Sequence, residues 1–472
     1  GVELGSFDDG KTIAEMKVLA TVYRATGDER FKEGFLRGLD FVFAAQYPTG
    51  GWPQSYPQRE GYSDNVTYND GAMINVLRLV RDVARSPLYD FVGPEYRARA
   101  EEALRKGIDY ILRSQIEVDG VLTAWGQQHD PFTYEPAYGR SFELPSITAG
   151  ESVGVVEFLM ELPDPGPEIR RAILSALLWF ERVRLPDGRW ARFYEIGTDR
   201  PFFVPRSGEK LYDYNELPLD ARGYAWYGTW PAGLVTFAFS TGYARDLWLS
   251  LDDFPIPWIE IDRSMTAAGT SLAGVVPLGV EVLSKAEGEI ERVAVEIDGE
   301  VYYEGASLPE RGALLLDTRA LSEGSHTLTV TAHHRRLGVF SRAASFTVRN
   351  WWRLTESFKA PEDAGWFGTV DYLRARERSE GWSYATGEAA AYFGDPDRMV
   401  APSDGGYLVW ETPHLKRFEF DVYTTAEAVS DRIGAWGLTP GGEWLELGFE
   451  ERLEGASGGL RHVKIAGEVD EG

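Results

Sequence analysis

The chain of 472 residues contains no cysteine. Disulfide bonds, thiolate metal sites and a cysteine nucleophile are therefore excluded. Histidine is scarce as well, since the chain has 6 and only His129 falls among the first 250 residues. A multi-histidine zinc site needs several such residues, and a catalytic triad needs one beside a serine. Both kinds of site are therefore disfavoured in this region.

Basic residues are outnumbered, with 48 lysines and arginines against 74 acidic residues and a net charge of −26. Nucleic acid would be repelled, because its binding depends on basic side chains that neutralise phosphates. An anionic polymer would be repelled too, unless the site holds its own cations. No run of about 18 apolar residues is present, so we expect no membrane-spanning helix. The chain begins at Gly1 without a signal segment, and we expect a fragment or a processed form.

Residues 1–250 are predicted to form helices joined by long, aromatic-rich loops. Apolar residues recur at helical spacing around Phe35, Leu104 and Ile173. After each of these segments come a glycine turn and a tryptophan. The three tryptophans are Trp52, Trp125 and Trp190.

The interval between these tryptophans holds two helices and a loop. Helical hairpins that cannot bury their own apolar face stack side by side. The pattern predicts an α/α toroid of three helical-hairpin repeats, with the glycine–tryptophan loops lining a shared cleft at one end. The alternative is that each tryptophan only caps a helix pair.

Residues 251–350 change to a period of two. Val293, Val295 and Ile297 recur at every second position, and Asp298-Gly299 follows as a turn. This pattern and the segment length predict a β-sandwich of the immunoglobulin or fibronectin type III kind.

Residues 351–472 are predicted to form a second all-β sandwich, in which Phe418 and Phe420 alternate along one strand. Exposed tryptophans could stack on sugar rings and make this a carbohydrate-binding module, whereas core packing is their more common fate. The segment contains seven of the 15 tryptophans of the chain: Trp351, Trp352, Trp366, Trp382, Trp410, Trp436 and Trp444.

Four polar, glycine-rich loops of the helical region combine acidic, basic and aromatic residues. Loops of this kind carry function more often than stability. Single residues have simpler explanations: an aspartate before a helix could be an N-cap, and an arginine could form a structural ion pair. Taken together, the loops point to carboxylate and guanidinium chemistry. They span residues 7–12, 61–71, 129–143 and 198–222.

A series of motifs lies in and beside these loops: Gly51-Trp52-Pro53-Gln54, residues 61–73 (GYSDNVTYNDGAM), residues 125–131 (WGQQHDP), residues 140–146 (RSFELPS), Glu151-Ser152, Arg192-Phe193-Tyr194-Glu195 and residues 223–228 (GYAWYG). Over about residues 5–245 this series resembles that of the family 10 polysaccharide lyases, which are pectate lyases. The family usually carries a further helical stretch before Asp8, so we expect a toroid that is N-terminally incomplete. Asp9 stands where the family commonly has asparagine.

The resemblance implies calcium-dependent β-elimination on polygalacturonate, with Arg140 as the catalytic base. It implies Asp8, Asp9 and Asp70 as ligands of Ca²⁺, and Asp64 is a further candidate in the same loop. A divalent ion between protein and substrate carboxylates would let an acidic site hold an acidic polymer. The expected substrate-binding residues are Lys210, Arg222, Asp130, Trp125, Tyr224 and Trp226. We further expect a monomer that is secreted by a bacterium and has no nucleic-acid or membrane partner.

Two alternatives stay open. One is a glycoside hydrolase on an α/α toroid, which would use two carboxylates such as Asp130 and Glu143. Lysine and arginine beside the acids favour an anionic substrate over this reading. The other is a pectin-binding or scaffold protein without activity.

Overall fold

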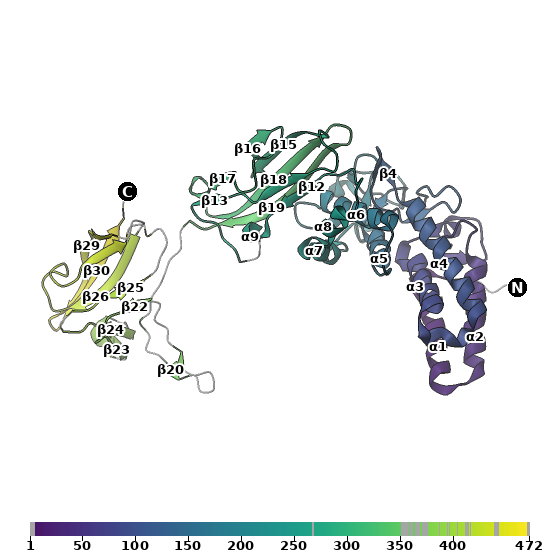
Figure 1. Ribbon diagram of the computed structural model, residues 1–472. Coiled ribbons are helices and arrows are strands. Elements are labelled where there is room, and N and C mark those ends of the chain that lie inside the picture. Colours follow the sequence, from purple (N-terminus) through teal and green to yellow (C-terminus); the bar gives the residue numbers. More distant parts are fainter. Residues whose placement is uncertain are drawn as a thin grey trace. The chain divides into compact units, whose positions relative to one another are not determined.

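The chain divides into two compact units, Gly1–Asn350 and Trp351–Gly472, each described here by itself (Figure 1). The computed structural model describes residues 5–266, 269–350, 358, 362–363, 369–370, 376–386, 388–393, 395, 397–403, 405–410, 415, 417–438 and 443–469.

Helices dominate the first part of unit Gly1–Asn350, and consecutive helices pack as pairs (Figure 1). The apolar spacing predicted for three of them is confirmed, because Phe35, Leu104 and Ile173 are all 0% exposed. A shorter fourth pair, α7 and α8, follows the three predicted hairpins. The helices are α1 (Lys11–Thr26), α2 (Glu29–Ala45), α3 (Ala72–Arg85), α4 (Pro94–Ser114), α5 (Ala149–Met160), α6 (Pro167–Arg182), α7 (Ala232–Ser240) and α8 (Tyr243–Leu249).

The three repeated tryptophans close the ends of the helices that precede them. Trp52, Trp125 and Trp190 are at most 1% exposed, so they line no open surface. Each indole Nε1 donates to a carbonyl in the last turn of α2, α4 or α6, where helical carbonyls lack partners of their own. The bonds run from Trp52 to Val42 (2.8 Å), from Trp125 to Ile111 (2.8 Å) and from Trp190 to Phe180 (2.7 Å). The predicted cleft-lining role is therefore wrong for these rings, and the capping alternative is confirmed.

Short strands tie the loops of successive helix pairs together. β3 pairs with β6, β7 pairs with β9, and β8 pairs with β11. The loops that enter α3, α5 and α7 are thereby held side by side, which fixes the surface that carries the site. The strands are β1 (Gly5–Ser6), β2 (Ser55–Tyr56), β3 (Val66–Thr67), β4 (Glu117–Val118), β5 (Val121–Leu122), β6 (Gln128–His129), β7 (Ile147–Thr148), β8 (Trp190–Ala191), β9 (Phe193–Tyr194), β10 (Pro201–Phe202) and β11 (Tyr227–Gly228).

The first β region is built on a four-stranded antiparallel sheet in the order β16-β15-β18-β19. The predicted hairpin is confirmed: Asp298 (φ 52°) and Gly299 (φ 85°) form the two-residue turn between β15 and β16. The elements are β12 (Trp258–Ile261), α9 (Arg263–Thr266), β13 (Val275–Pro277), β14 (Val280–Leu283), β15 (Ile290–Ile297), β16 (Glu300–Gly305), β17 (Leu315–Asp317), β18 (Gly324–His334) and β19 (Gly338–Val348).

The helical part and the first β region share one core. Buried residues from α1 to β19 form a continuous apolar cluster, and β19 packs against α6. Two further strand pairs, β12–β14 and β13–β17, complete the β region. Residues 1–250 and 251–350 thus form a single compact unit.

Unit Trp351–Gly472 contains a three-stranded antiparallel sheet, β26-β30-β29, and several two-stranded ones. Trp351, Trp352 and Trp366 lie outside the described residues. Trp436 and Trp444 are 55% and 56% exposed on the hairpin β27–β28. The strands are β20 (Glu362–Asp363), β21 (Thr369–Val370), β22 (Glu377–Arg378), β23 (Ser383–Thr386), β24 (Asp397–Val400), β25 (Leu408–Val409), β26 (Arg417–Thr424), β27 (Ala435–Leu438), β28 (Trp444–Leu447), β29 (Glu450–Ser457) and β30 (Leu460–Glu468).

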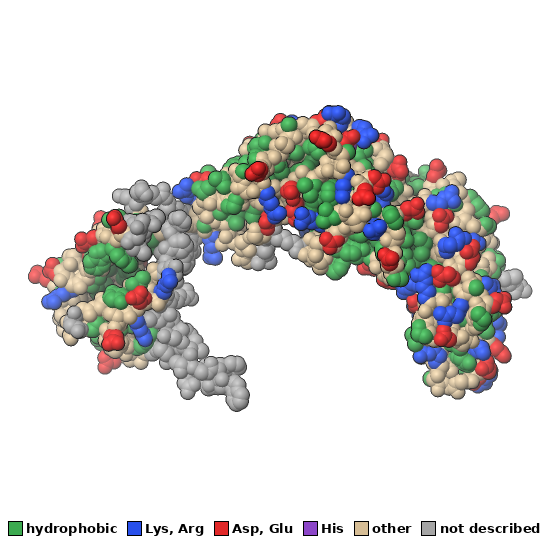
Figure 2. All heavy atoms as spheres, in the orientation of Figure 1, with side chains coloured by type: hydrophobic (Ala, Val, Ile, Leu, Met, Phe, Trp, Pro, Cys, Tyr) green, Lys and Arg blue, Asp and Glu red, His purple; other side chains and the backbone are tan. Residues whose placement is uncertain are grey.

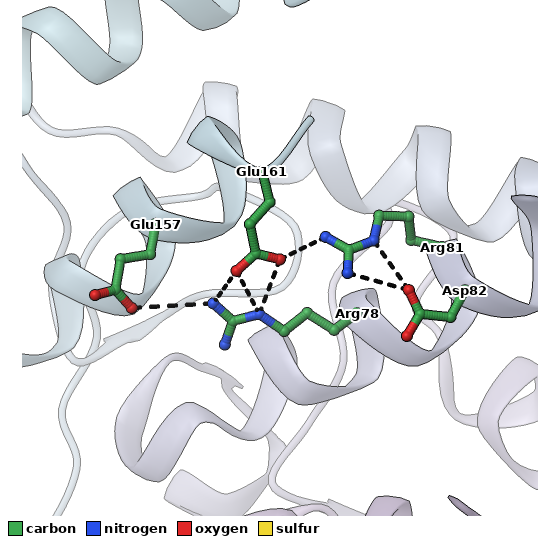
Figure 3. Close-up of polar contacts among 5 residues, drawn as sticks. All are labelled: Arg78, Arg81, Asp82, Glu157 and Glu161. Atoms are coloured by element: carbon green, nitrogen blue, oxygen red, sulfur yellow. Dashed lines mark hydrogen bonds and ion pairs between the residues drawn. The ribbon is translucent and has the colours of Figure 1, made fainter. Parts of the chain in front are cut away.

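A group of ion pairs fastens α3 to α5 (Figure 3). Arg78 contacts Glu161 at 2.6 Å and Glu157 at 4.0 Å, and Arg81 bridges Glu161 and Asp82. These pairs join the middle and the C-terminal part of α3 to the C-terminal end of α5, away from the N-terminal ends that border the site.

The surface carries both signs of charge despite the negative total. Blue and red side chains intermingle over the helical part in Figure 2. In the described residues, no helix combines the length and the hydropathy needed to cross a bilayer.

Candidate active site

Two loops of the helical part share one backbone conformation. In the loop before α1, Asp9 and Gly10 have φ values of 52° and 65°, and in the loop before α3, Asp70 and Gly71 have φ values of 50° and 66°. Aspartate and glycine are among the few residues that adopt this left-handed region readily. Both glycines face Asn75, because a Cβ on Gly10 would lie 2.8 Å and one on Gly71 3.1 Å from its Nδ2. The two loops therefore converge as copies of one turn.

This convergence brings three predicted ligands together. Carboxylate oxygens of Asp8, Asp9 and Asp70 lie within 4.8 Å of one another, and we call these residues the acidic cluster. The N-cap alternative is wrong here, because Gly10 and Gly71 occupy the N-caps of α1 and α3 without a side-chain bond.

The acidic cluster is poorly neutralised by the protein. Oδ1 of Asp8 is buried and has no hydrogen-bond partner in the described part of the chain. Asp9 pairs with the exposed Lys11 at 3.3 Å. Burial raises the pKa of the Asp70 carboxyl, and the charges of Asp8 and Asp9 raise it further. Three like charges and an unpaired buried oxygen suit a hard divalent cation, which takes about six to eight oxygen ligands.

Asp64 is placed elsewhere. Its carboxylate accepts hydrogen bonds from the backbone N–H groups of Arg59 (3.0 Å) and Glu60 (2.8 Å), and it closes their turn. It is not one of the three residues whose oxygens converge, so the structure gives it a role in the loop and corrects its expected grouping with the ligands.

The predicted cations gather on a second feature, an aromatic cluster with a core of its own. Tyr224 lies below two guanidinium groups, that of Arg192 at 4.9 Å and that of Arg140 at 5.9 Å from the ring centre. Lys210 lies 4.9 Å from the ring of Phe202, and Arg222 lies 5.7 Å from that of Tyr214. The buried members of the cluster are Phe193, Phe202, Phe203, Val204, Leu217 and Trp226.

Each of these cations already has a partner. Arg140 forms an ion pair with Glu143, and this hydrogen bond raises the pKa of Arg140. The remaining contacts run from Arg192 to Glu151 Oε1 (2.6 Å), from Lys210 to Glu195 Oε1 (2.9 Å), and from Arg222 to the carbonyls of Leu217 (2.9 Å) and Asn215 (2.7 Å).

We call the cations on the aromatic cluster the basic side of the site, and Glu143 is its central carboxylate. Its side chain is 4% exposed and accepts bonds from the backbone N–H of Arg140 (2.9 Å), from Tyr224 Oη (3.1 Å) and from Gln127 Nε2 (3.2 Å). Burial alone would raise the pKa of Glu143, but the hydrogen bonds from Arg140 outweigh it and the pKa is lowered. Glu143 therefore stays ionised.

A chain of hydrogen bonds connects Glu143 with the acidic cluster. Gln127 Nε2 also donates to Asn69 Oδ1 at 2.8 Å, and Asn69 Nδ2 donates to Asp70 Oδ2 at 2.6 Å. Two side-chain amides thus join the predicted calcium ligands to the predicted base.

The structure corrects the expected contact of two tryptophans with substrate. Trp125 is 0% exposed and Trp226 is 3% exposed. The Trp226 indole donates to the Ala221 carbonyl at 2.8 Å, so it supports the aromatic cluster from inside. Tyr224 is half-buried above it and remains a candidate for substrate contact.

Neither carboxylate considered for the hydrolase alternative, Asp130 or Glu143, is suited to act as the general acid. Asp130 accepts bonds from the backbone N–H groups of Phe132 and Thr133, both at 2.8 Å. Burial would raise the pKa of Asp130, but these bonds lower it, as Arg140 does for Glu143. A glycosidase needs one carboxyl group with a raised pKa as its general acid, and neither residue of this pair provides it.

Sequence reasoning missed three polar residues of the site. Gln127, Glu151 and Arg192 all lie within the motif series, but nothing in a linear sequence distinguishes them from their neighbours. The informative signal is a polar residue that the fold buries: Gln127 is 6% and Glu151 8% exposed, and the Arg192 side chain is 15% exposed.

Comparisons with known proteins identify related lyases. Residues 1–189 and 186–235 match the family model of pectic acid lyases. A family 10 polysaccharide lyase from Cellvibrio cellulosa is 36% identical over 51% of this chain and 82% of its own, with a TM-score of 0.48. A mutant of that lyase in complex with trigalacturonic acid is 35% identical over 51% of this chain and 83% of its own, with a TM-score of 0.48. No curated protein matches the chain. The matched residues hold both the acidic cluster and Arg140, and the chain belongs to the family 10 polysaccharide lyases.

Proposed function

We propose that this lyase cleaves polygalacturonate by calcium-dependent β-elimination and releases 4,5-unsaturated oligogalacturonides. One observation carries the proposal: a cluster of three poorly neutralised carboxylates is linked by hydrogen bonds to an arginine set among further cations. The complex of the related lyase with trigalacturonic acid supports a polygalacturonate substrate.

The reaction needs one proton acceptor. Arg140 takes the proton from C5 of the sugar, and the electrons of that C–H bond form the C4–C5 double bond. The C4–O4 bond breaks, O4 leaves with its electron pair, and it gains a proton from water. Negative charge builds on the C5 carboxylate during this step, so positive groups nearby lower the barrier. Lys210, Arg192 and Arg222 are the cations on the aromatic cluster that can supply them.

Asp8, Asp9 and Asp70 would hold Ca²⁺. The ion would add positive charge beside the substrate carboxylates and would relieve the repulsion between the acidic site and an acidic polymer.

Arg140 must lose a proton before it can act as a base. Its ion pair with Glu143 raises its pKa, so the arrangement described above is a protonated resting state. We therefore expect an alkaline optimum, because only rising pH populates the neutral guanidine. We further propose that the protein is secreted by a bacterium, is a monomer and folds as an α/α toroid. Four consecutive helix pairs support the toroid, and a polymeric substrate supports secretion.

Turnover of polygalacturonate with calcium and with excess EDTA tests the proposal. We expect ultraviolet absorbance of the unsaturated product to rise with calcium and to stop with the chelator. Reducing ends without that absorbance would mean a hydrolase, and retention of the polymer without turnover would mean a binding protein. Full activity in EDTA would remove calcium from the mechanism.

For unit Trp351–Gly472 we propose glycan binding on the hairpin β27–β28. Trp436 pairs with Glu446 across the hairpin, and Trp444 pairs with Leu438, so both indoles lie on one face. Their exposure of 55% and 56% leaves both rings open to stack on sugars. The adjacent carboxylate of Glu446 disfavours a polyuronate, and we propose a neutral polysaccharide.

Sedimentation of the full chain with insoluble neutral polysaccharides tests this second proposal. Trp436→Ala with Trp444→Ala should abolish retention and leave turnover of short oligogalacturonates unchanged. Equal retention of the wild type and the double variant would contradict it.

A further inference from the structure

Gln127 donates from one amide nitrogen to two acceptors of the site. Its Nε2 lies 2.8 Å from Asn69 Oδ1 and 3.2 Å from Glu143 Oε1, so two acceptors face one NH₂ group. A carboxylate at this position would repel Glu143, and an aliphatic side chain would leave both acceptors without this donor.

The polarity of the hydrogen-bond chain is fixed at both ends. Ionised Glu143 and Asp70 can only accept, so Gln127 must turn its NH₂ toward Glu143 and Asn69 must turn its NH₂ toward Asp70. The Asn69 oxygen then faces Gln127 and accepts its second proton. Flipping the Asn69 amide would break a bond at each of its ends, and flipping the Gln127 amide would break both bonds of its NH₂ group.

This arrangement is unfavourable for the oxygen of the same Gln127 amide. Oε1 of Gln127 is buried and has no hydrogen-bond partner in the described part of the chain. A buried acceptor without a partner is unfavourable, and such groups are rare in native proteins. The fold tolerates it where the NH₂ group serves both sides of the site.

We propose that Gln127 is a positioning residue that couples the acidic cluster to Arg140, so that calcium affinity and the reactivity of Arg140 depend on each other. On one side Gln127 orients Asn69, which holds the Asp70 carboxylate. On the other side it helps to fix Glu143, which holds Arg140 through both backbone and side chain. Reciprocity by thermodynamic necessity applies to the two equilibria involved, calcium binding and the protonation of Arg140, and not to kcat itself. The inference rests on the proposed calcium-dependent lyase activity.

Gln115 provides a matched control elsewhere in the same unit. It is 6% exposed, as Gln127 is, and its Oε1 also lacks a partner in the described residues. Its Nε2 donates to two backbone carbonyls, those of Thr123 (2.9 Å) and Ala172 (3.0 Å). Gln115→Leu therefore removes a similar buried amide without touching either side of the site.

The experiment compares Gln127→Leu with Gln115→Leu in the full chain. Titration calorimetry with calcium alone should show an affinity about three- to tenfold weaker for Gln127→Leu, the effect of one hydrogen bond, and no change for Gln115→Leu. At saturating calcium, kcat should fall in Gln127→Leu while KM for polygalacturonate stays the same. Equal calcium affinity in Gln127→Leu and the wild type would overturn the coupling.

Asn69→Ala keeps the inference testable if Gln127→Leu does not fold. Asn69 is half-buried, and its variant should lower kcat at saturating calcium, although Asn69 contacts only the acidic side. Where Gln127→Leu does fold, the losses in calcium affinity in the double variant should be less than additive, because both residues act through one chain of hydrogen bonds. An unchanged kcat for Asn69→Ala, or strict additivity, would overturn the coupling.

The calcium titration separates this inference from the proposed function. A wild type that binds calcium but releases no unsaturated product contradicts the proposed function alone. If the wild type has calcium-dependent activity and Gln127→Leu leaves calcium affinity and kcat unchanged, the coupling alone is contradicted.

Discussion

The acidic cluster and the basic side of the site differ in how far their charged groups are already paired within the protein. The acidic cluster has an unpaired buried oxygen on Asp8 and a raised pKa on Asp70. On the basic side, Arg140 and Lys210 are already paired with Glu143 and Glu195. In the proposed mechanism the acidic cluster would gain a cation, whereas the basic side would exchange protein partners for substrate carboxylates.

Because of this difference, we expect the acidic cluster and the basic side to contribute to binding in different ways. Adding a cation to the acidic cluster relieves repulsion, so it should stabilise the fold as well as the complex. Substrate carboxylates that reach the basic side must compete with carboxylates already present, which favours a polyanion with several charges over a single acid. The following predictions test this contrast.

Arg140→Ala should have the largest effect, because it removes the proposed proton acceptor. We expect kcat to fall by about 10²–10⁴-fold or more, as measured by formation of unsaturated product. Arg78→Ala is the matched control, since it also removes an arginine from an ion pair but lies between α3 and α5 (Figure 3). Activity that survives in Arg140→Ala would assign the base to another group.

Asp70→Asn should weaken calcium binding and yet stabilise the calcium-free fold. The folded-state pKa of Asp70 is raised by burial and by neighbouring carboxylates. A raised carboxyl pKa contributes stability below the unfolded pKa, and this contribution is lost as pH rises through the folded pKa. At neutral pH the charge therefore opposes folding, though by less than about 1 kcal/mol, because solvent screens it.

Thermal melts with and without calcium measure both effects. The wild type should gain stability on adding calcium, and Asp70→Asn should start higher and gain less. A variant that melts lower than the wild type without calcium would show that the acidic cluster is not under repulsion.

Glu143→Gln should shift the pH dependence of the reaction. Loss of the opposite charge lowers the pKa of Arg140, so the neutral guanidine is populated at lower pH. We expect the acidic limb of the pH profile of kcat/KM to move down by about one unit or more. The value of kcat at the optimum should fall too, because Arg140 loses its anchor. An unmoved limb would mean that Arg140 is not the group that titrates there.

Glu161→Gln should have the smallest effect. It weakens the ion pairs with Arg78 and Arg81 that fasten α3 to α5. Such partly exposed pairs contribute about 0.2–1 kcal/mol each, so denaturant melts should show a small loss of stability. Calcium affinity and kcat should stay at wild-type values. A loss of calcium affinity would show that the helix contact, and not the loops alone, sets the geometry of the acidic cluster.

The sequence was most informative where periodicity or backbone chemistry is local. The apolar spacing around Phe35 predicted α2, and Asp298-Gly299 predicted the hairpin turn, because both depend on neighbouring residues only. The acidic cluster could be inferred from a resemblance, and the structure brings Asp8, Asp9 and Asp70 together.

Burial and long-range pairing could not be read in this way. Trp125 and Asp64 look like surface residues of functional loops, but one closes α4 and the other closes a turn. The pairing of Gln127 with both Asn69 and Glu143 joins the loop before α3 to two distant points of the loop between α4 and α5. Only the assembled helix pairs place these residues within hydrogen-bond distance.

The contrast between buried and exposed tryptophans has an optical consequence. Trp52, Trp125 and Trp190 are enclosed and bonded to backbone carbonyls, whereas Trp436 and Trp444 face solvent. Indoles in an apolar interior emit at shorter wavelength than indoles in water. Opening of the helix ends should therefore shift the fluorescence emission of the enclosed indoles to longer wavelength. Quenchers in solution, or a sugar polymer, should first change the emission of the two exposed indoles on the hairpin β27–β28. The chain carries native reporters for both of its units.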